Sequence, residues 1–470
     1  MRVCLLLLLF LAVFLPEKLS AGQVIIEGNH TSYAGKTLAF ATFQDPFTGK
    51  DSIIATCKVD STGCFRTIFH IEQPQLIYTR LGALKGYLHV EPNQKYVISL
   101  PEWQDMSPAD KLNPFFEPIE FQFTIENDTN ANSLNRSILQ FDTLYFKYLA
   151  KFTRPRNINR DTLNQVKNML LSLVTNDAPI FFKDYATYKI GLLELLAMQY
   201  RVKHLSKQYF ENKPLLYNNE AYLDLFNRVY DKYFYYFGQS LQGKSIYNII
   251  NDRKDYRALD SLLQNDPVLT NAELRTLVIL KNLHDEFYAS RFSRSGLLNI
   301  LDSLIKYTTN TIHKQYALSI REKITRLMPG YAPPAFSLYD RHHRLVNLSD
   351  FKGYYVYLNF CSCQSYACLK EFDLLGNLAQ KYSNKNFIIV TVVIDEDTAS
   401  MLPYAEKASM NWIFLHYGHQ PDVVKKYDIR GFPTYYLIGP DGKLLLSPAK
   451  SPGEYFELDL FKIMRARGDM

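Results

Sequence analysis

The sequence lacks several motifs that would assign it to a common class of enzyme or binding protein. It has no Gly-x-x-x-x-Gly-Lys-Ser/Thr loop, no Gly-x-Gly-x-x-Gly fingerprint and no Gly-x-Ser-x-Gly elbow, so phosphate-loop, dinucleotide and serine-hydrolase sites are not indicated. With 53 Lys and Arg against 47 Asp and Glu, it also lacks the basic stripe typical of nucleic-acid-binding proteins. We therefore expect no nucleic-acid partner.

The composition is that of a folded protein. Hydrophobic residues make up 47% and charged residues 21% of the 470 positions, which excludes a disordered or low-complexity chain. At about 100–200 residues per domain, this length corresponds to two to four domains with buried cores.

Long apolar runs are absent except at the start of the chain. Arg2 precedes an apolar run over 3–15, and small residues at 20–21 suit cleavage before Gly22. The run is shorter than the ~20 residues of a membrane-spanning helix. We interpret 1–21 as a signal peptide, with an uncleaved membrane anchor as the alternative. The sequence thus predicts an exported protein of the periplasm or outer cell envelope.

Cysteine is scarce, with six residues in the chain, and Cys4 lies inside the predicted signal. The other five would reside where disulfides persist, and an odd number leaves at least one thiol free or paired between molecules. Cys361, Cys363 and Cys368 lie within eight residues of each other. The chemistry is expected there.

Residues 22–126 predict a small antiparallel β domain. Turn-forming residues separate short runs rich in β-branched and aromatic residues. These runs cover 23–27, 37–43, 52–59, 64–71 and 96–100. The segment from Asp60 to Gly63 predicts a hairpin turn, flanked by Cys57 and Cys64. Whether these two cysteines form a disulfide depends on the hairpin register, so a disulfide and two half-buried thiols both remain open.

Residues 127–328 predict an all-α domain, because apolar residues recur there at helical spacing. A Tyr- and Phe-rich stripe runs from Tyr222 to Phe237, and we expect it to be core rather than a binding platform. Thr270 with Glu273 predicts a capping box ahead of a helix over 274–287. No fixed-period repeat is present, so a helical solenoid is not indicated.

Residues 329–470 begin with a linker containing Pro329, Pro333 and Pro334. Beyond it, strands alternate with helices, which predicts an α/β domain around one open sheet. The run over 387–395 is continuously apolar, as in a central strand buried on both faces. Further strands are expected over 346–348, 354–360 and 412–416, a hairpin over 434–446, and helices over 366–382, 397–408, 422–427 and 454–465.

Four motifs in this last part resemble those of TlpA-like thioredoxin-fold proteins, within the wider alkyl hydroperoxide reductase/thiol-specific antioxidant group. They are Pro-Ala-Phe-Ser-Leu (334–338), Leu-Ser-Asp-Phe-Lys-Gly (348–353), Tyr-Leu-Asn-Phe (357–360) and Gly-Phe-Pro-Thr (431–434). The resemblance covers about 329–468. It implies a C-terminal α/β thioredoxin fold and an exported bacterial protein with a β domain and a helical domain ahead of it.

In such a domain, a strand delivers a thiol to the N-terminus of a helix, where backbone N–H groups and the helix dipole stabilise a thiolate. The thiolate attacks a disulfide, and a second cysteine three residues later resolves the mixed disulfide. A cis-proline faces the site. The resemblance assigns this role to Pro433 and implies that Pro433 and Thr434 bind substrate, which would be protein thiols, disulfides or partner peptide segments.

The sequence departs from the family at the first cysteine of Cys-x-x-Cys, which falls on Ser365, whereas the second falls on Cys368. A serine hydroxyl is hardly ionised near neutral pH and cannot exchange with a disulfide. We predict that Cys368 is the reactive thiol of an envelope thiol-disulfide oxidoreductase-like protein, with Cys363 as its preferred disulfide partner. The resemblance gives Glu371 a proton-handling role, and an exposed helix carboxylate is the alternative.

Two alternative functions stay open. One is a non-catalytic thioredoxin-fold module that binds partner segments beside Pro433. The other is a peroxiredoxin-like peroxidase, because Ser365-x-x-Cys368 resembles the Thr/Ser and Cys pair of those enzymes. Against it, Pro433 stands where they carry an arginine, and Arg430 lies three residues upstream.

Soft thiolate ligands favour copper(I), so one alternative is a copper(I) site formed by Cys361, Cys363 and Cys368 with His416 or His419. The spacing matches no zinc pattern. We therefore expect neither a metal nor a cofactor.

Overall fold

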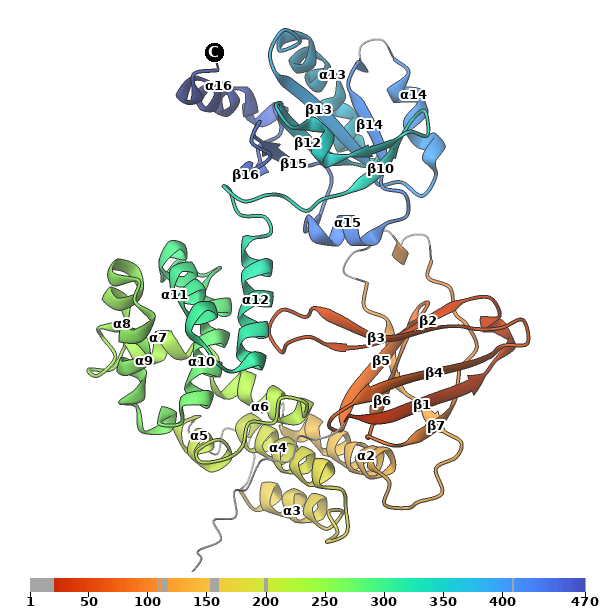
Figure 1. Ribbon diagram of the computed structural model, residues 1–470, viewed down its shortest axis with the longest axis vertical. Helices are drawn as coiled ribbons and strands as arrows, with labels where there is room; N and C mark the ends of the chain where they lie inside the picture. Colours follow the sequence, from red (N-terminus) through yellow and green to blue (C-terminus); the bar gives the residue numbers. More distant parts are fainter. Residues whose placement is uncertain are drawn as a thin grey trace, which may run out of the picture.

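A computed structural model of the chain describes residues 21–107, 110–111, 113, 116–152, 160–197, 202–407 and 410–469. The predicted signal peptide, except Ala21, lies outside the described residues. Three regions follow one another along the chain: a β region, a helical region and an α/β region (Figure 1). Among the described residues, no helix has both the length and the apolar character needed to cross a bilayer.

The N-terminal region consists of two sheets that share one core. Its strands are β1 (Gly22–Asn29), β2 (Thr37–Phe43), β3 (Asp51–Lys58), β4 (Cys64–Ile71), β5 (Gln75–Leu81), β6 (Leu84–Val90), β7 (Lys95–Ser99), β8 (Ile119–Gln122) and β9 (Thr124–Ile125). The sheet orders are β4-β1-β7-β9 and β3-β2-β5-β6-β8. Most pairs are antiparallel, as predicted, but β1 with β7 and β6 with β8 are parallel. Val24 and Phe40, from different sheets, lie in the same buried cluster.

The turn at 60–63 forms, but the predicted hairpin is wrong. Asp60 Oδ1 accepts hydrogen bonds from the N–H groups of Thr62 (2.8 Å) and Cys64 (2.9 Å), and Gly63 takes a φ of +91°. The flanking strands do not pair with each other: β3 pairs with β2, and β4 with β1. Cys57 and Cys64 therefore belong to different sheets, and both thiols are free. The candidate disulfide between them is not formed in this structure.

The middle region is helical, as predicted. Its α-helices are α2 (Leu134–Phe152), α3 (Arg160–Leu171), α4 (Ile180–Leu196), α5 (Val202–Tyr209), α6 (Glu220–Val229), α7 (Tyr233–Gly238), α8 (Ile246–Asn248), α9 (Tyr256–Gln264), α10 (Ala272–Glu286), α11 (Arg294–Tyr307) and α12 (Thr311–Thr325). In the aromatic stripe, Tyr222, Phe226 and Phe234 are fully buried, so the prediction that it forms core is confirmed. The capping prediction was one residue off, because Asn271 rather than Thr270 caps α10.

The β region packs on the helical region through the connection between β2 and β3, which reaches α6 and α12 (Figure 1). The Phe47 ring lies 6.4 Å from that of Phe226 and 6.0 Å from that of Tyr316. Lys323 Nζ donates to the Thr48 carbonyl oxygen at 3.0 Å. Aromatic contacts and charge-assisted hydrogen bonds thus join the two regions.

The C-terminal region has the predicted alternation of strands and helices. Its elements are β10 (Ser337–Asp340), β11 (Leu345–Asn347), β12 (Tyr355–Cys361), α13 (Tyr366–Lys381), β13 (Phe387–Val393), α14 (Leu402–Ala405), β14 (Ile413–His416), α15 (Pro421–Lys426), β15 (Thr434–Ile438), β16 (Leu444–Ala449) and α16 (Phe456–Arg467). The sheet order is β11-β10-β14-β13-β12-β15-β16. The helix expected over 397–408 is shorter, with a 3-10 turn over Thr398–Met401 before α14. Strand β10 was not predicted.

Strand β12 lies inside this sheet and has a separate core on each face. Tyr357 and Cys361 point into the cluster under α13 and α16, whereas Leu358 and Phe360 point into the cluster on the other face. This alternation follows from the two-residue period of a strand. It delivers the cysteine at the end of β12 to the face that carries α13. The C-terminal α/β thioredoxin fold is confirmed.

Candidate active site

The candidate site lies where β12 ends and α13 begins. Ser365 is the N-cap residue of α13, with extended backbone angles, and its N–H donates to the Ser362 carbonyl oxygen at 3.0 Å. This closes a tight turn between Cys361, the last residue of the strand, and Cys368, in the first turn of the helix. The N–H groups of a first helical turn have no partner within the helix and favour an anion nearby.

Cys368 is only 1% exposed, yet its surroundings favour the thiolate. Its Sγ accepts hydrogen bonds from the Cys361 thiol, the Ser362 N–H at 3.4 Å and the Ser365 hydroxyl. These donors, led by Cys361, hold the pKa of Cys368 below that of an ordinary cysteine, although burial and the Asp395 carboxylate act against them. Cys368 is therefore the acidic thiol of the site.

Cys361 is completely buried and acts as the donor in this contact. Burial raises its pKa strongly, and so does its hydrogen bond to Cys368. Its Sγ also lies 3.7 Å from the Ser362 carbonyl oxygen, a second acceptor for the same proton. Of the two thiols, Cys361 therefore holds its proton more tightly than Cys368.

Cys363, the predicted partner of Cys368, has a different environment. Its backbone N–H donates to Asp395 Oδ2 at 2.9 Å, and its side chain is 6% exposed. Burial, and then the charges of Asp395 and Cys368, raise the pKa of Cys363 to about 12. The thiol that acts on Cys368 through a hydrogen bond is thus Cys361, whereas the sequence analysis preferred Cys363 as its partner.

Asp395 is a site residue that the sequence analysis missed. Its carboxylate is buried and accepts hydrogen bonds from Ser362 Oγ (2.6 Å), the Cys363 N–H (2.9 Å) and Ser400 Oγ (2.8 Å). Its charge acts on all three cysteines and raises their pKa values. A carboxylate directly after a central parallel strand could have signalled this, since sites gather at the carboxyl ends of such strands.

His416 is tied to the same edge of the sheet. Its Nε2–H donates to the Asp395 carbonyl oxygen at 2.8 Å, and its Nδ1 accepts from the Gly418 N–H at 3.0 Å. Burial lowers the pKa of His416, which agrees with a neutral ring in one tautomer. Within the described ranges, no group of three or more His, Cys, Asp and Glu is arranged to hold a metal ion.

Glu371 faces the sheet under α13. Its Oε2 accepts a hydrogen bond from the Tyr435 hydroxyl at 3.1 Å. Burial raises the pKa of Tyr435, and the charge of Glu371 raises it further. The carboxylate hydrogen-bonded to the loop that carries the cysteines is Asp395, on the other side of the site.

Pro433 and Thr434 lie beside the end of β12. The peptide bond between Phe432 and Pro433 is cis, as the resemblance implied. Thr434 pairs with Phe360, which places Pro433 one residue further along, level with Cys361. The Thr434 hydroxyl donates to the Gly431 carbonyl oxygen at 2.7 Å, so it stabilises the loop that carries the proline.

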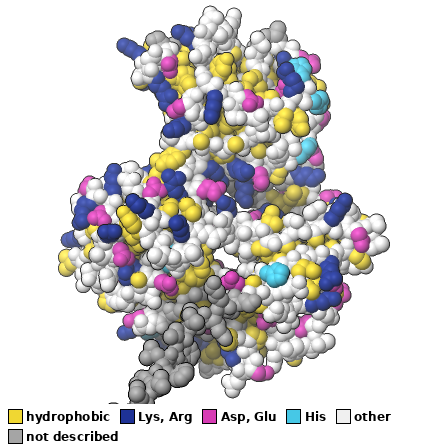
Figure 2. Space-filling view, in the orientation of Figure 1, with side chains coloured by type: hydrophobic (Ala, Val, Ile, Leu, Met, Phe, Trp, Pro, Cys, Tyr) yellow, Lys and Arg dark blue, Asp and Glu magenta, His cyan; other side chains and the backbone are white. Residues whose placement is uncertain are grey.

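The surface beside the site is mixed in character. Tyr366, the first residue of α13, is 80% exposed, and the neighbouring Gln364 is exposed as well. Over the face shown in Figure 2, acidic and basic side chains are interspersed with apolar ones. An exposed aromatic ring beside a helix N-terminus offers an apolar contact for a bound segment.

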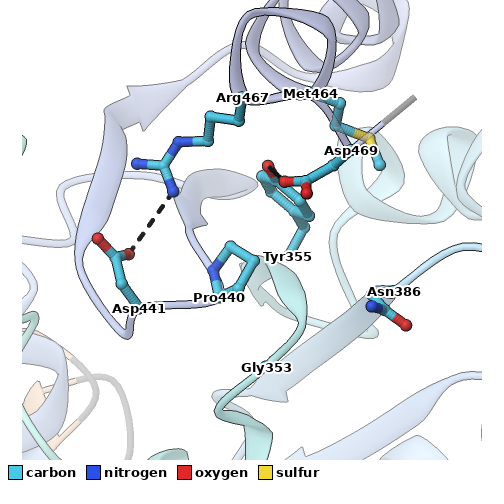
Figure 3. Close-up of a pocket in the computed structure, with 8 residues that line it drawn as sticks. All are labelled: Gly353, Tyr355, Asn386, Pro440, Asp441, Met464, Arg467 and Asp469. Atoms are coloured by element: carbon cyan, nitrogen blue, oxygen red, sulfur yellow. Dashed lines mark hydrogen bonds and ion pairs between the residues drawn. The ribbon is translucent and has the colours of Figure 1, made fainter.

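A cavity of about 560 Å³ lies at the opposite end of β12, where Tyr355 begins the strand (Figure 3). The Tyr355 hydroxyl donates to Asp469, and Arg467 pairs with Asp441 at 3.8 Å. Six residue steps separate Tyr355 from Cys361, or about 20 Å along a strand. This cavity is therefore not part of the thiol site.

Comparison with known proteins agrees with the fold of the C-terminal region. The Redoxin family matches residues 328–448. The thiol-disulfide oxidoreductase ResA of Bacillus subtilis is 29% identical over 155 residues, covering 33% of this chain and 82% of ResA. ResA of Geobacillus thermodenitrificans is 27% identical over 151 residues, or 32% of this chain and 82% of the relative.

Solved structures similar to this part include the thioredoxin domain of a Bacteroides vulgatus thiol-disulfide oxidoreductase, with 28% identity, a TM-score of 0.27 and coverage of 29% of this chain and 98% of that domain. A DsbE-type thiol:disulfide interchange protein from Chlorobium tepidum has 26% identity, a TM-score of 0.27 and coverage of 30% and 98%. By its motifs, its fold and its sequence relatives, the chain carries a TlpA-like thioredoxin-fold domain in its C-terminal region, and the match to the Redoxin family covers residues 328–448.

Proposed function

We propose that the protein is an exported thiol-disulfide oxidoreductase-like protein in which Cys368 is the reactive thiol. The observation that carries this proposal is the set of donors on its sulfur, from Cys361, Ser362 and Ser365. Thiolates are the nucleophiles of disulfide exchange, and a lowered pKa at a helix start is how proteins prepare them.

Ser365 takes a supporting role in this proposal. It stands at the first position of the family's Cys-x-x-Cys and cannot form a mixed disulfide. Its hydroxyl instead donates to Cys368 and stabilises the thiolate. Exchange at this site therefore begins at Cys368, and a neighbouring cysteine, Cys361 or Cys363, has to complete it.

The substrates we propose are protein disulfides or thiols, presented as extended segments beside Pro433 and Thr434. ResA of Bacillus subtilis, to which this chain is similar, is a thiol-disulfide oxidoreductase, which supports this substrate class. The signal-like pattern over 1–21 supports export. In an exported protein, disulfides persist long enough to serve as substrates.

A non-catalytic binding module is the second candidate, and one observation favours it: the Cys368 side chain is only 1% exposed. A substrate disulfide must reach that sulfur before exchange can start. The peroxidase alternative is less well supported, because Arg430, three residues before Pro433, pairs with Asp428 at 3.2 Å.

The test is the reaction of the full chain with dithiodipyridine, a small neutral disulfide whose released thiopyridone absorbs light. We expect exchange at Cys368 with a pH midpoint below that of an ordinary thiol. The phase of the reaction with this low pH midpoint should be lost in Cys368→Ser and kept in Cys64→Ser, which removes only the contribution of an exposed thiol of the β region. If Cys368 stays unmodified in the folded protein at all pH values, the result contradicts the oxidoreductase function and supports the non-catalytic binding module.

A further inference from the structure

We propose that Cys361 is the second thiol of the site and that the oxidised protein carries a Cys361–Cys368 disulfide. This inference rests on the proposed function, since it needs Cys368 to react first. It moves the redox pair from the family's spacing of three residues to a spacing of seven, with both sulfurs on the buried side of the first turn of α13.

The first argument is direct contact between the two side chains. Cys361 Sγ lies 3.7 Å from the Ser362 carbonyl oxygen, and hydrogen bonding by the same thiol is the main cause that lowers the pKa of Cys368, so the two sulfurs lie close together. Both residues belong to the same buried cluster between the sheet and α13. The Ser362 N–H, which also donates to Cys368 Sγ at 3.4 Å, fixes the turn between them.

The second argument comes from the elements that carry the two cysteines. Cys361 ends β12, which is paired on both sides, with β13 and with β15. Cys368 lies in the first turn of α13. Both backbones are held by regular hydrogen bonding, so the pair is preorganised and closes with little loss of conformational entropy.

The third argument concerns the competing thiol. The Cys363 N–H is tied to Asp395, which also accepts from Ser362 and Ser400. Cys363 acts on Cys368 through charge, whereas Cys361 acts through a hydrogen bond. The Asp395 network holds the loop backbone at Ser362 and Cys363, so any movement of this loop to pair Cys363 with Cys368 would have to break it.

In the proposed reaction, a substrate disulfide is the oxidant of Cys361 and Cys368. The Cys368 thiolate attacks one sulfur of that disulfide, the substrate's sulfur–sulfur bond breaks, and the first leaving thiolate takes a proton from solvent. Cys361 then gives up its proton to the second leaving sulfur and attacks Cys368, which breaks the mixed disulfide. The substrate is reduced to two thiols, and the two cysteines are oxidised to one disulfide.

The experiment treats the full chain, with Cys57 and Cys64 both replaced by serine, with dithiodipyridine and analyses the product by intact and tandem mass spectrometry. We expect the parent to lose two hydrogens and to keep no adduct at Cys368. In Cys361→Ala, the mixed disulfide should persist with one thiopyridyl group on Cys368. Cys363→Ala, the matched control, should form the internal disulfide as the parent does.

The opposite pattern would overturn the inference: an adduct that persists in Cys363→Ala and resolves in Cys361→Ala. Because Cys361 is fully buried, Cys361→Ser is included in case the alanine variant does not fold. Tandem spectra of the oxidised parent locate the linkage independently of any variant. No adduct and no disulfide at Cys368 in the parent would count against the proposed function itself, which keeps the two failures distinct.

Discussion

Cys57 in the β region and Cys368 in the C-terminal domain are both free thiols, but their acidities shift in opposite directions. Cys57 is half-buried, and burial raises its pKa. Cys368 is almost fully buried, yet its pKa is lowered by the donors that converge on its sulfur. The comparison shows that hydrogen-bond donors, more than exposure, set which thiol ionises.

The backbone explains the difference. Cys57 lies within β3, an edge strand that pairs with β2, and the backbone N–H groups of a strand lie in the plane of the sheet rather than toward its side chains. Cys368 lies in the first turn of α13, where free N–H groups and the helix dipole face the side chain. A strand interior offers its side chains no such donors.

The largest effect on the reactivity of the C-terminal site is expected from Ser365→Cys. It creates a Cys-x-x-Cys motif with Cys368 at the start of α13 and adds a nucleophile at the N-cap. We expect disulfide reductase activity, measured as insulin reduction by the full chain, to rise by about a hundredfold, the scale of gain from a correctly placed reacting group. Cys64→Ser should leave the rate unchanged, and no gain in Ser365→Cys would show that the site is closed to protein substrates.

The second prediction compares the two thiols within one molecule. Alkylation by iodoacetamide, followed peptide by peptide with mass spectrometry, should give Cys368 a pH midpoint below that of Cys57 by at least about one unit. A hydrogen bond to a charged group is worth about 1.5–3 kcal/mol, and one pKa unit corresponds to about 1.4 kcal/mol. Equal midpoints would break the comparison, because the donors on Cys368 would then have no effect.

Asp395→Asn removes the negative charge beside the thiols. Because Asp395 raises the pKa values of Cys363 and Cys368, both should fall, by up to about one unit, which is the usual spread among protein sites. The amide cannot satisfy all three donors of the carboxylate, so the free energy of unfolding should drop by about 1–3 kcal/mol. Thiol titration and urea unfolding measure the two effects, with the exposed Asp422→Asn as control. A rise in the thiol pKa values would contradict this account.

The smallest expected effect is that of Ser365→Ala, which removes one of the donors to Cys368. A typical hydrogen bond contributes about 1 kcal/mol, so the pKa of Cys368 should rise by about one unit or less. Ultraviolet titration of the thiolate provides the measurement, and Ser383→Ala, exposed just beyond α13, serves as control. A shift as large in the control as in Ser365→Ala would remove the assigned role of the Ser365 hydroxyl.

Local patterns were enough to predict most elements of the C-terminal domain. The apolar run of β13, the helix α13 and the hairpin β15–β16 all follow from residue periodicity and turn residues. The strand pairing of the β region was harder to predict. A turn sequence such as Asp60 to Gly63 fixes the local bend, but it does not fix whether the flanking strands pair with each other or enter different sheets.

The sequence by itself determined that Ser365 and Cys368 lie three residues apart at the start of a helix. It could not determine which thiol meets Cys368, or that Asp395 lies beside the loop. Those contacts join residues seven or more positions apart through a turn and a sheet edge. The reason is that side-chain direction in an irregular turn depends on the hydrogen bonds that the packed sheet supplies, and these form only in the tertiary structure.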